Sequence, residues 1–148
     1  MIEGRVIRST GSWYVVQTSD GEMVEARVRG KMRQKKIRST NPVAVGDMVL
    51  VSKVDDDYTI SELKERKNYS ARKSLNLSKQ SPLIASNLDQ AVLVATVKDP
   101  ITFPTFIDRF CVASESFHIP IVIVFNKVDL LDKDEREMLE SFAQLYVN

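Results

Sequence analysis

The sequence of 148 residues has one cysteine and one histidine, and all five of its glycines lie before residue 47. With Cys111 alone, neither an internal disulfide nor a multi-cysteine zinc site can form. No hydrophobic run is long enough to cross a bilayer as a helix, and the N-terminus lacks the apolar core of a signal peptide. We therefore expect a protein of the reducing cytoplasm with no membrane partner.

The sequence also lacks the common motifs for phosphate binding, catalysis and metal binding. The phosphate-cradling pattern G-x-x-x-x-G-K-[ST] is missing, and no glycine follows Gly46. No Ser–His–Asp set, carboxylate pair or group of metal ligands stands out. His118 lies in a turn before Pro120 and is expected at the surface, and Cys111 is expected as a small core residue. The sequence thus predicts no catalytic residue and no metal ligand in this chain.

Charge is spread unevenly along the sequence. Residues 1–80 contain 16 Lys and Arg against 10 Asp and Glu, whereas residues 81–148 contain 5 against 10. This asymmetry indicates two units with different partners.

The first 65 residues read as short strands separated by turn signals, among them the hairpin dipeptide Asp20-Gly21. Five short strands with a longer connection after the third predict a small Greek-key barrel of the OB type, with an SH3-like barrel as the rival that strand counting leaves open. The expected strands are Gly4–Arg8, Trp13–Thr18, Glu22–Arg29, Met48–Val54 and Tyr58–Leu63.

After residue 88 the spacing of the apolar residues changes. Gln90–Val97 and Ile121–Phe125 are apolar runs typical of buried parallel strands, and an amphipathic helix beginning near Pro104 separates them. A last helix is expected after Asp132, with Glu135 as its capping-box partner. Two strands and two helices cannot cover a parallel sheet, so we expect part of an α/β domain. The predicted organisation is a barrel over residues 1–68, a linker over 69–88 and a truncated α/β domain over 89–148.

The second apolar strand runs directly into Asn126, Lys127, Val128 and Asp129, an N-K-x-D turn. The Asp129 carboxylate can accept two parallel hydrogen bonds from adjacent N–H groups of guanine, a pair that adenine does not offer. Asn126 can bond the other polar edge of the base, and the Lys127 stem can cover its face. The pattern predicts a guanine site; the alternative is a polar loop in which Asn and Asp merely make the turn.

A basic segment lies between the third and fourth expected strands. It places seven positive charges within twelve residues, and no acidic residue occurs between Ala26 and Gly46. Such a stripe matches a phosphate backbone, and the few available aromatic residues favour recognition of RNA shape over base stacking. The alternative is a solvated loop with no partner. The predicted RNA-binding residues are Arg27, Arg29, Lys31, Arg33, Lys35, Lys36 and Arg38.

Taken together, these segments resemble the family of ribosome small-subunit-dependent GTPase A (RsgA, also called YjeQ), a circularly permuted GTPase. The resemblance covers essentially the whole chain. It is carried by Arg66-Lys67-Asn68, by Ile84–Gln90, by Phe106–Phe110 and by Ile119–Leu131 with its N-K-x-D turn.

The resemblance implies a factor for small ribosomal subunit biogenesis that binds ribosomal RNA through its barrel and hydrolyses GTP to GDP and phosphate. In this family the phosphate loop follows the guanine motif, which accounts for its absence here. Mg²⁺ and a structural Zn²⁺ are then expected only with a missing C-terminal part, and this chain alone is predicted to be inactive and monomeric. Two alternatives stay open: a stand-alone RNA-binding module with a structural α/β appendage, and a protein that borrows its phosphate site from a second chain.

Overall fold

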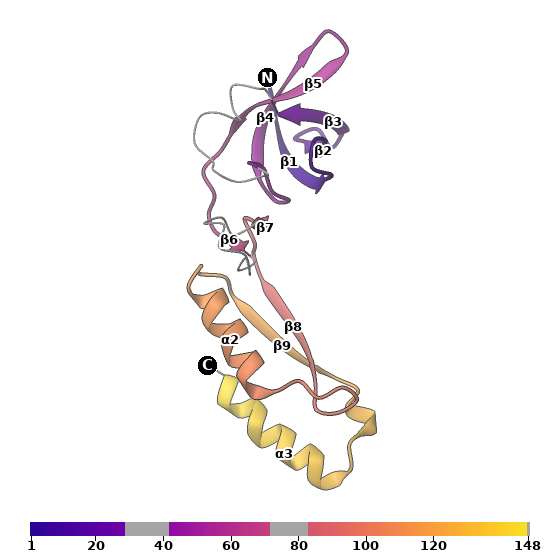
Figure 1. Cartoon of the computed structure of the whole chain (residues 1–148), viewed down its shortest axis with the longest axis vertical. Helices are drawn as coiled ribbons and strands as arrows, with labels where there is room; N and C mark the ends of the chain where they lie inside the picture. Colours follow the sequence, from indigo (N-terminus) through magenta and orange to yellow (C-terminus); the bar gives the residue numbers. More distant parts are fainter. Residues whose placement is uncertain (29–41, 72–82, 148) are drawn as a thin grey trace. The chain divides into compact units, whose positions relative to one another are not determined.

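The computed structural model describes residues 1–28, 42–71 and 83–147 (Figure 1). The chain forms two compact units, Met1–Leu88 and Asp89–Asn148. In its described residues the first unit is built from strands, whereas the second combines a parallel pair of strands with helices.

Five strands among the described residues of the first unit close a barrel: β1 (Ile2–Ser9), β2 (Tyr14–Thr18), β3 (Met23–Val28), β4 (Met48–Val54) and β5 (Asp57–Leu63). Their order around the barrel is β1-β2-β3-β5-β4. β3 and β5 pair in parallel, and the other neighbours are antiparallel, including the closing pair of β1 and β4. This arrangement is that of an OB-type barrel rather than an SH3-like one, so the predicted fold is confirmed.

Alternate residues of the strands fill the barrel. Successive side chains of a strand point to opposite faces, so the buried Tyr14 and Val16 leave Trp13 and Val15 directed outward. The same alternation buries Ala26 and exposes Arg27. The buried cluster consists of Val6, Tyr14, Val16, Val24, Ala26, Val43, Val49, Val51 and Ile60.

Two short strands follow the barrel in the same unit. β6 (Tyr69–Ala71) pairs antiparallel with β7 (Leu83–Ser86), and an isolated bridge joins Val45 to Ala85. The sequence predicts a linker over residues 69–88. The described residues of this stretch instead form a small sheet that belongs to the first unit.

A buried ion pair holds β7 against the barrel. Asp47 is 0% exposed and accepts hydrogen bonds from the backbone N–H of Ala44 at 2.8 Å and from Nε and Nη2 of Arg66 at 2.6 and 2.7 Å. The Ser86 hydroxyl donates to the same carboxylate. The hydrogen bond with Asp47 raises the pKa of Arg66 above its ordinary value. We refer to Asp47, Arg66 and Ser86 as the Asp47 cluster.

The backbone next to this cluster requires a glycine. Gly46 has φ +92°, and a Cβ at this position would lie 2.0 Å from the carbonyl oxygen of Ser86. Its own carbonyl accepts a hydrogen bond from the side chain of Asn87 at 2.9 Å. Asn68 exchanges two hydrogen bonds with the backbone of Leu88, at 2.8 and 2.7 Å. Side chains therefore fix the backbone up to the last residue of the unit.

The second unit is a βαβ arrangement with a further helix. β8 (Ala91–Thr96) and β9 (Ile121–Asn126) pair in parallel, and α2 (Pro104–Glu115) connects them. The 3-10 turn η1 (Val128–Leu130) leads into α3 (Lys133–Ala143), which is followed by a second 3-10 turn, η2 (Gln144–Tyr146). Asp132 and Glu135 form the predicted capping box at the start of α3. The expected partial α/β fold is confirmed.

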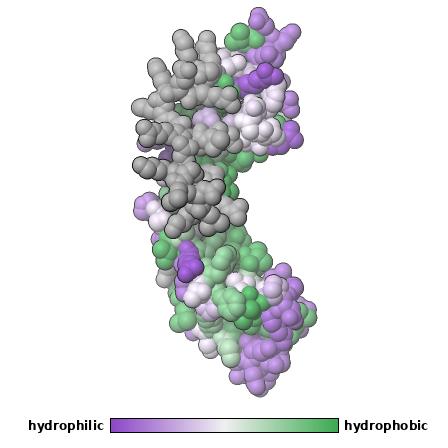
Figure 2. Space-filling model, in the orientation of Figure 1, coloured by the Kyte–Doolittle hydropathy of each residue, from purple (hydrophilic) through white to green (hydrophobic). Residues whose placement is uncertain are grey.

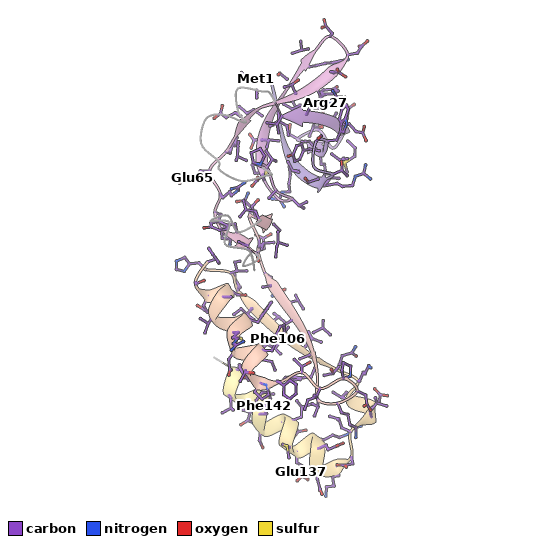
Figure 3. The ribbon with its side chains drawn as sticks, in the orientation of Figure 1. Met1, Arg27, Glu65, Phe106, Glu137 and Phe142 are labelled. Carbon is purple, nitrogen blue, oxygen red and sulfur yellow. The ribbon has the colours of Figure 1, made fainter. Side chains whose placement is uncertain are left out.

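Among the described residues, the helices cover one face of the two-stranded sheet. Leu93, Ala95 and Ile107 are buried there, and the rings of Phe125 and Phe142 meet edge to face with centroids 6.2 Å apart. Phe142 lies on α3 (Figure 3). On the opposite face Val92 and Val94 are 53% and 60% exposed. Figure 2 shows hydrophobic residues at the surface of this unit, whereas the end where α3 begins is hydrophilic. None of the described helices is both long and apolar enough to span a membrane.

Candidate guanine and RNA sites

The N-K-x-D residues lie at the carboxyl end of β9. Asn126 is the last residue of the strand, Lys127 has φ 58° in the left-handed region, and Val128 begins η1. The side-chain oxygen of Asn126 accepts a hydrogen bond at 2.8 Å from the backbone N–H of Lys127. The chain therefore turns sharply at the edge of the sheet where open α/β folds bind ligands.

The loop after β8 braces this turn. The Lys127 ammonium donates a hydrogen bond to the carbonyl oxygen of Asp99. The neighbouring Lys98 donates to Glu135 at 2.6 Å, and Glu135 also accepts from the backbone N–H of Asp132 at 2.9 Å. The N-K-x-D turn is thus held from the β8 side, and the start of α3 is tied to the same loop.

The Asp129 carboxylate is exposed and makes no hydrogen bond or ion pair with any residue that the structure describes. Its neighbours in the motif are exposed as well, with Val128 at 41%, while the buried Leu131 anchors the end of the loop. A carboxylate that is held on a braced loop and is open on its acceptor side suits recognition of the paired N–H groups of guanine.

The ion pair between Lys98 and Glu135 predicts a response to acid. The hydrogen bond from Lys98 lowers the pKa of Glu135 below its ordinary value of 4.5. A carboxylate with a lowered pKa stabilises the fold above its unfolded pKa, and this contribution is lost as pH falls through the folded-state pKa. We therefore expect the contribution of this ion pair to be lost as pH falls through the folded-state pKa of Glu135, which lies below its ordinary value.

An NMR titration of the Glu135 carboxyl group checks this expectation. Lys98→Met should return the pKa of Glu135 toward its ordinary value. Lys133→Met is a matched control, because Lys133 lies on the same helix and pairs with Glu137 at 3.9 Å. An unchanged Glu135 titration in Lys98→Met would contradict the proposed brace.

Of the seven predicted RNA-binding residues, Arg27 lies within the described part of the chain. Arg29, Lys31, Arg33, Lys35, Lys36 and Arg38 lie outside it. Arg27 is exposed on β3 (Figure 3), and its Cζ lies 3.7 Å from the centroid of the Trp13 ring. Sequence reasoning missed this pairing. The Asp20-Gly21 signal alone would not have revealed it, because a two-residue turn there would place Tyr14 opposite Arg27, whereas the observed register pairs Tyr14 with Ala26.

The other aromatic and reactive residues singled out in the sequence lie in or beside a hydrophobic core, or at the surface. Tyr14 is 2% exposed, and Tyr58 packs partly against the barrel core. Cys111 packs at the edge of the core of the second unit, where desolvation raises the pKa of its thiol. His118 is exposed. Within the described ranges, no three His, Cys, Asp or Glu side chains come together as metal ligands.

Known structures share both units of this fold. YjeQ from Thermotoga maritima superposes with a TM-score of 0.75 at 28% identity, over 97% of this chain and 47% of its own. YloQ, described as a circularly permuted GTPase, gives a TM-score of 0.73 at 28% identity, over 99% of this chain and 48% of its own. The fold therefore defines the class: an OB-type barrel followed by part of a circularly permuted GTPase domain.

Family and sequence comparisons narrow the class. The family model for the RsgA N-terminal domain matches residues 3–60, and the one for the RsgA GTPase matches residues 63–148. The chain belongs to the RsgA family. It is 52% identical over 146 residues to the small ribosomal subunit biogenesis GTPase RsgA of Bacteroides fragilis and 48% identical over 148 residues to RsgA 2 of Bacteroides thetaiotaomicron. The alignments cover 98% and 99% of this chain, but 47% and 48% of those proteins. The chain thus spans about half the length of the curated relatives it matches.

Proposed function

We propose that this chain acts as part of a small ribosomal subunit biogenesis GTPase, with an RNA-binding barrel and a guanine-selecting α/β unit. The observation that supports this function best is that the match to one family runs along nearly the whole chain. Both units match one family in the same order, and identity to a relative with that name is 52% over 98% of the chain. Such a factor would work in the cytoplasm, where ribosomal subunits are assembled.

The barrel is the proposed contact with ribosomal RNA. The seven basic residues from Arg27 to Arg38 supply the charge that a phosphate backbone requires, and no acidic residue interrupts them. Tyr14 is buried and Tyr58 is partly buried, so they offer little surface for base stacking. This distribution favours recognition of the shape and backbone of folded RNA.

The turn of Asn126, Lys127, Val128 and Asp129 is the proposed guanine contact for GTP and GDP. Hydrolysis needs groups that hold phosphates and Mg²⁺, and these 148 residues contain no phosphate loop. We infer that the chain alone is an inactive monomer. The phosphate loop, the Mg²⁺ ligands and a structural Zn²⁺ site would come from additional sequence. Because these residues contain no phosphate loop, we also consider a second function, that of an RNA-binding module whose α/β unit is structural.

Binding to purified small ribosomal subunits across a salt series tests the RNA function. The unmodified chain should bind, with an affinity that falls steeply as salt rises, because each neutralised phosphate releases counterions. A variant with Lys31, Arg33, Lys35 and Lys36 changed to Gln should bind at least about tenfold more weakly and show a shallower salt dependence.

A matched control removes the same number of positive charges elsewhere, by changing Lys53, Lys64, Lys98 and Lys133 to Gln. This control should retain most of the affinity. Equal losses in both variants would show that net charge alone drives binding. A chain that does not bind subunits at all would contradict an RNA function that is independent of nucleotide.

A further inference from the structure

Trp13 and Arg27 face each other across the β2–β3 hairpin. The ladder pairs Tyr14 with Ala26 and Val15 with Glu25, so the next step places Trp13 opposite Arg27. Because Tyr14 and Ala26 point into the barrel, this neighbouring pair points outward. The separation of 3.7 Å between the guanidinium carbon and the ring centroid is that of close cation–π stacking.

The turn before β2 holds the backbone of Trp13 in place. The backbone N–H of Thr10 donates a hydrogen bond to the carbonyl oxygen of Trp13 at 2.9 Å, and the Thr10 hydroxyl donates to the same oxygen at 3.2 Å. The Tyr14 hydroxyl reaches back to the carbonyl of Gly11 at 3.4 Å. A shallow surface hollow lies beside the stacked pair, lined by Gly11, Ser12, Trp13, Tyr14, Arg27 and Val28.

The N–H donors of Arg27 face no acceptor among the described residues: the guanidinium makes no hydrogen bond and no ion pair with them. Another exposed arginine of the barrel differs in this respect, since Arg8 lies 3.7 Å from the carboxylate of Glu25. Stacking on an indole fixes the plane of a guanidinium but leaves its edge open. A flat fork of donors with fixed orientation matches two oxygens of a phosphate group.

Building on the proposed RNA function of the barrel, we propose that Trp13 and Arg27 form a binding site for one phosphate group of the RNA backbone. Trp13 positions the guanidinium, and Arg27 donates two parallel hydrogen bonds to the phosphate oxygens. A backbone phosphate carries no sequence information, so the site sets the position of the RNA on the barrel rather than its sequence.

Affinity for purified small ribosomal subunits, measured by filter binding across a salt series, tests the site in the full chain. Arg27→Gln should weaken binding by about tenfold and lower the number of released ions by about one. Arg27→Lys should still lose several-fold in affinity, because an ammonium keeps the charge but not the planar fork. Trp13→Leu should lose about as much as Arg27→Lys and add little when combined with it.

Arg8→Gln is the matched control, because it removes the same charge from an exposed arginine of the barrel that already has a carboxylate partner. It should change affinity by no more than about twofold. Arg27 is exposed, so Arg27→Gln should keep the fold, which circular dichroism would verify.

Equal effects of Arg27→Gln and Arg8→Gln would overturn the site while leaving RNA binding by the barrel intact. Full affinity in Arg27→Lys would show that Arg27 acts as a point charge, and it would also overturn the site. An unmodified chain that fails to bind subunits would overturn the proposed RNA function, and this site with it.

Discussion

Asp47→Asn is expected to lower the free energy of unfolding of the first unit by about 3–5 kcal/mol, the cost of leaving one member of a buried ion pair without its partner. Asp47 is 0% exposed, and the Arg66 side chain is 17% exposed. An asparagine offers a single acceptor oxygen, whereas the carboxylate accepts hydrogen bonds from Ala44, Arg66 and Ser86. The Arg66 charge would remain largely buried beside an amide.

Urea denaturation measures this change directly. Trp13 is the sole tryptophan of the chain and lies in the barrel, so its fluorescence follows the first unit. Glu3→Gln is a matched control, because it breaks an exposed ion pair. The carboxylate of Glu3 lies 2.6 Å from the ammonium of Lys64, and the two side chains are 44% and 39% exposed. That change should cost less than about 1 kcal/mol.

A second comparison separates the cost of leaving the Arg66 charge unpaired from the cost of losing the ion pair itself. Replacing both residues, Asp47→Leu with Arg66→Met, should restore part of the stability, because an apolar pair leaves no buried charge behind. A loss in Asp47→Asn as small as that in Glu3→Gln would mean that the Asp47 cluster does not hold β7 on the barrel.

The barrel shows how far local pattern determines a fold. Alternating apolar residues and the Asp20-Gly21 turn predict β2 and β3, and the strands form where that pattern occurs. The Asp47 cluster was not predictable in this way. Its members lie 19 to 39 positions apart, at residues 47, 66 and 86, and no local period brings a carboxylate, a guanidinium and a hydroxyl together. For the same reason, the polar stretch over residues 69–88, which the sequence predicts as a linker, contains the strands β6 and β7.

The N-K-x-D turn likewise has features that the sequence predicts and features that it does not. Its place after a buried strand follows from the run Ile121–Phe125, and the capping box at Asp132 follows from residue types three positions apart. The contact of Lys127 with the carbonyl of Asp99 depends on the alignment of two parallel strands. Their register pairs Thr96 with Asn126 and so brings the two loops to one edge. Sequence predicts that these strands pair but not their register.

Asp129→Asn is expected to weaken GTP binding by about 10²–10⁴-fold, since the change weakens or removes two hydrogen bonds to a charged group, each worth about 1.5–3 kcal/mol. The measurement needs a complete nucleotide site. It can be made in a chimera that continues this chain with the remaining sequence of the Bacteroides fragilis relative. The unmodified chimera, titrated with GTP and ATP by calorimetry, gives the reference. Asp134→Asn removes the same charge from another exposed acid nearby and should leave the affinity for GTP unchanged.

The sharper outcome concerns which base the altered site prefers. Guanine presents two N–H groups to a carboxylate, whereas xanthine replaces the amino group with a carbonyl. An asparagine at position 129 can accept from the remaining N–H and donate to that carbonyl, so Asp129→Asn should bind XTP more tightly than GTP. Loss of both nucleotides in a folded chimera would make Asp129 a structural residue of the loop. Unchanged selectivity for GTP would mean that the N-K-x-D turn does not read the base, and would favour an RNA-binding module with a structural α/β unit.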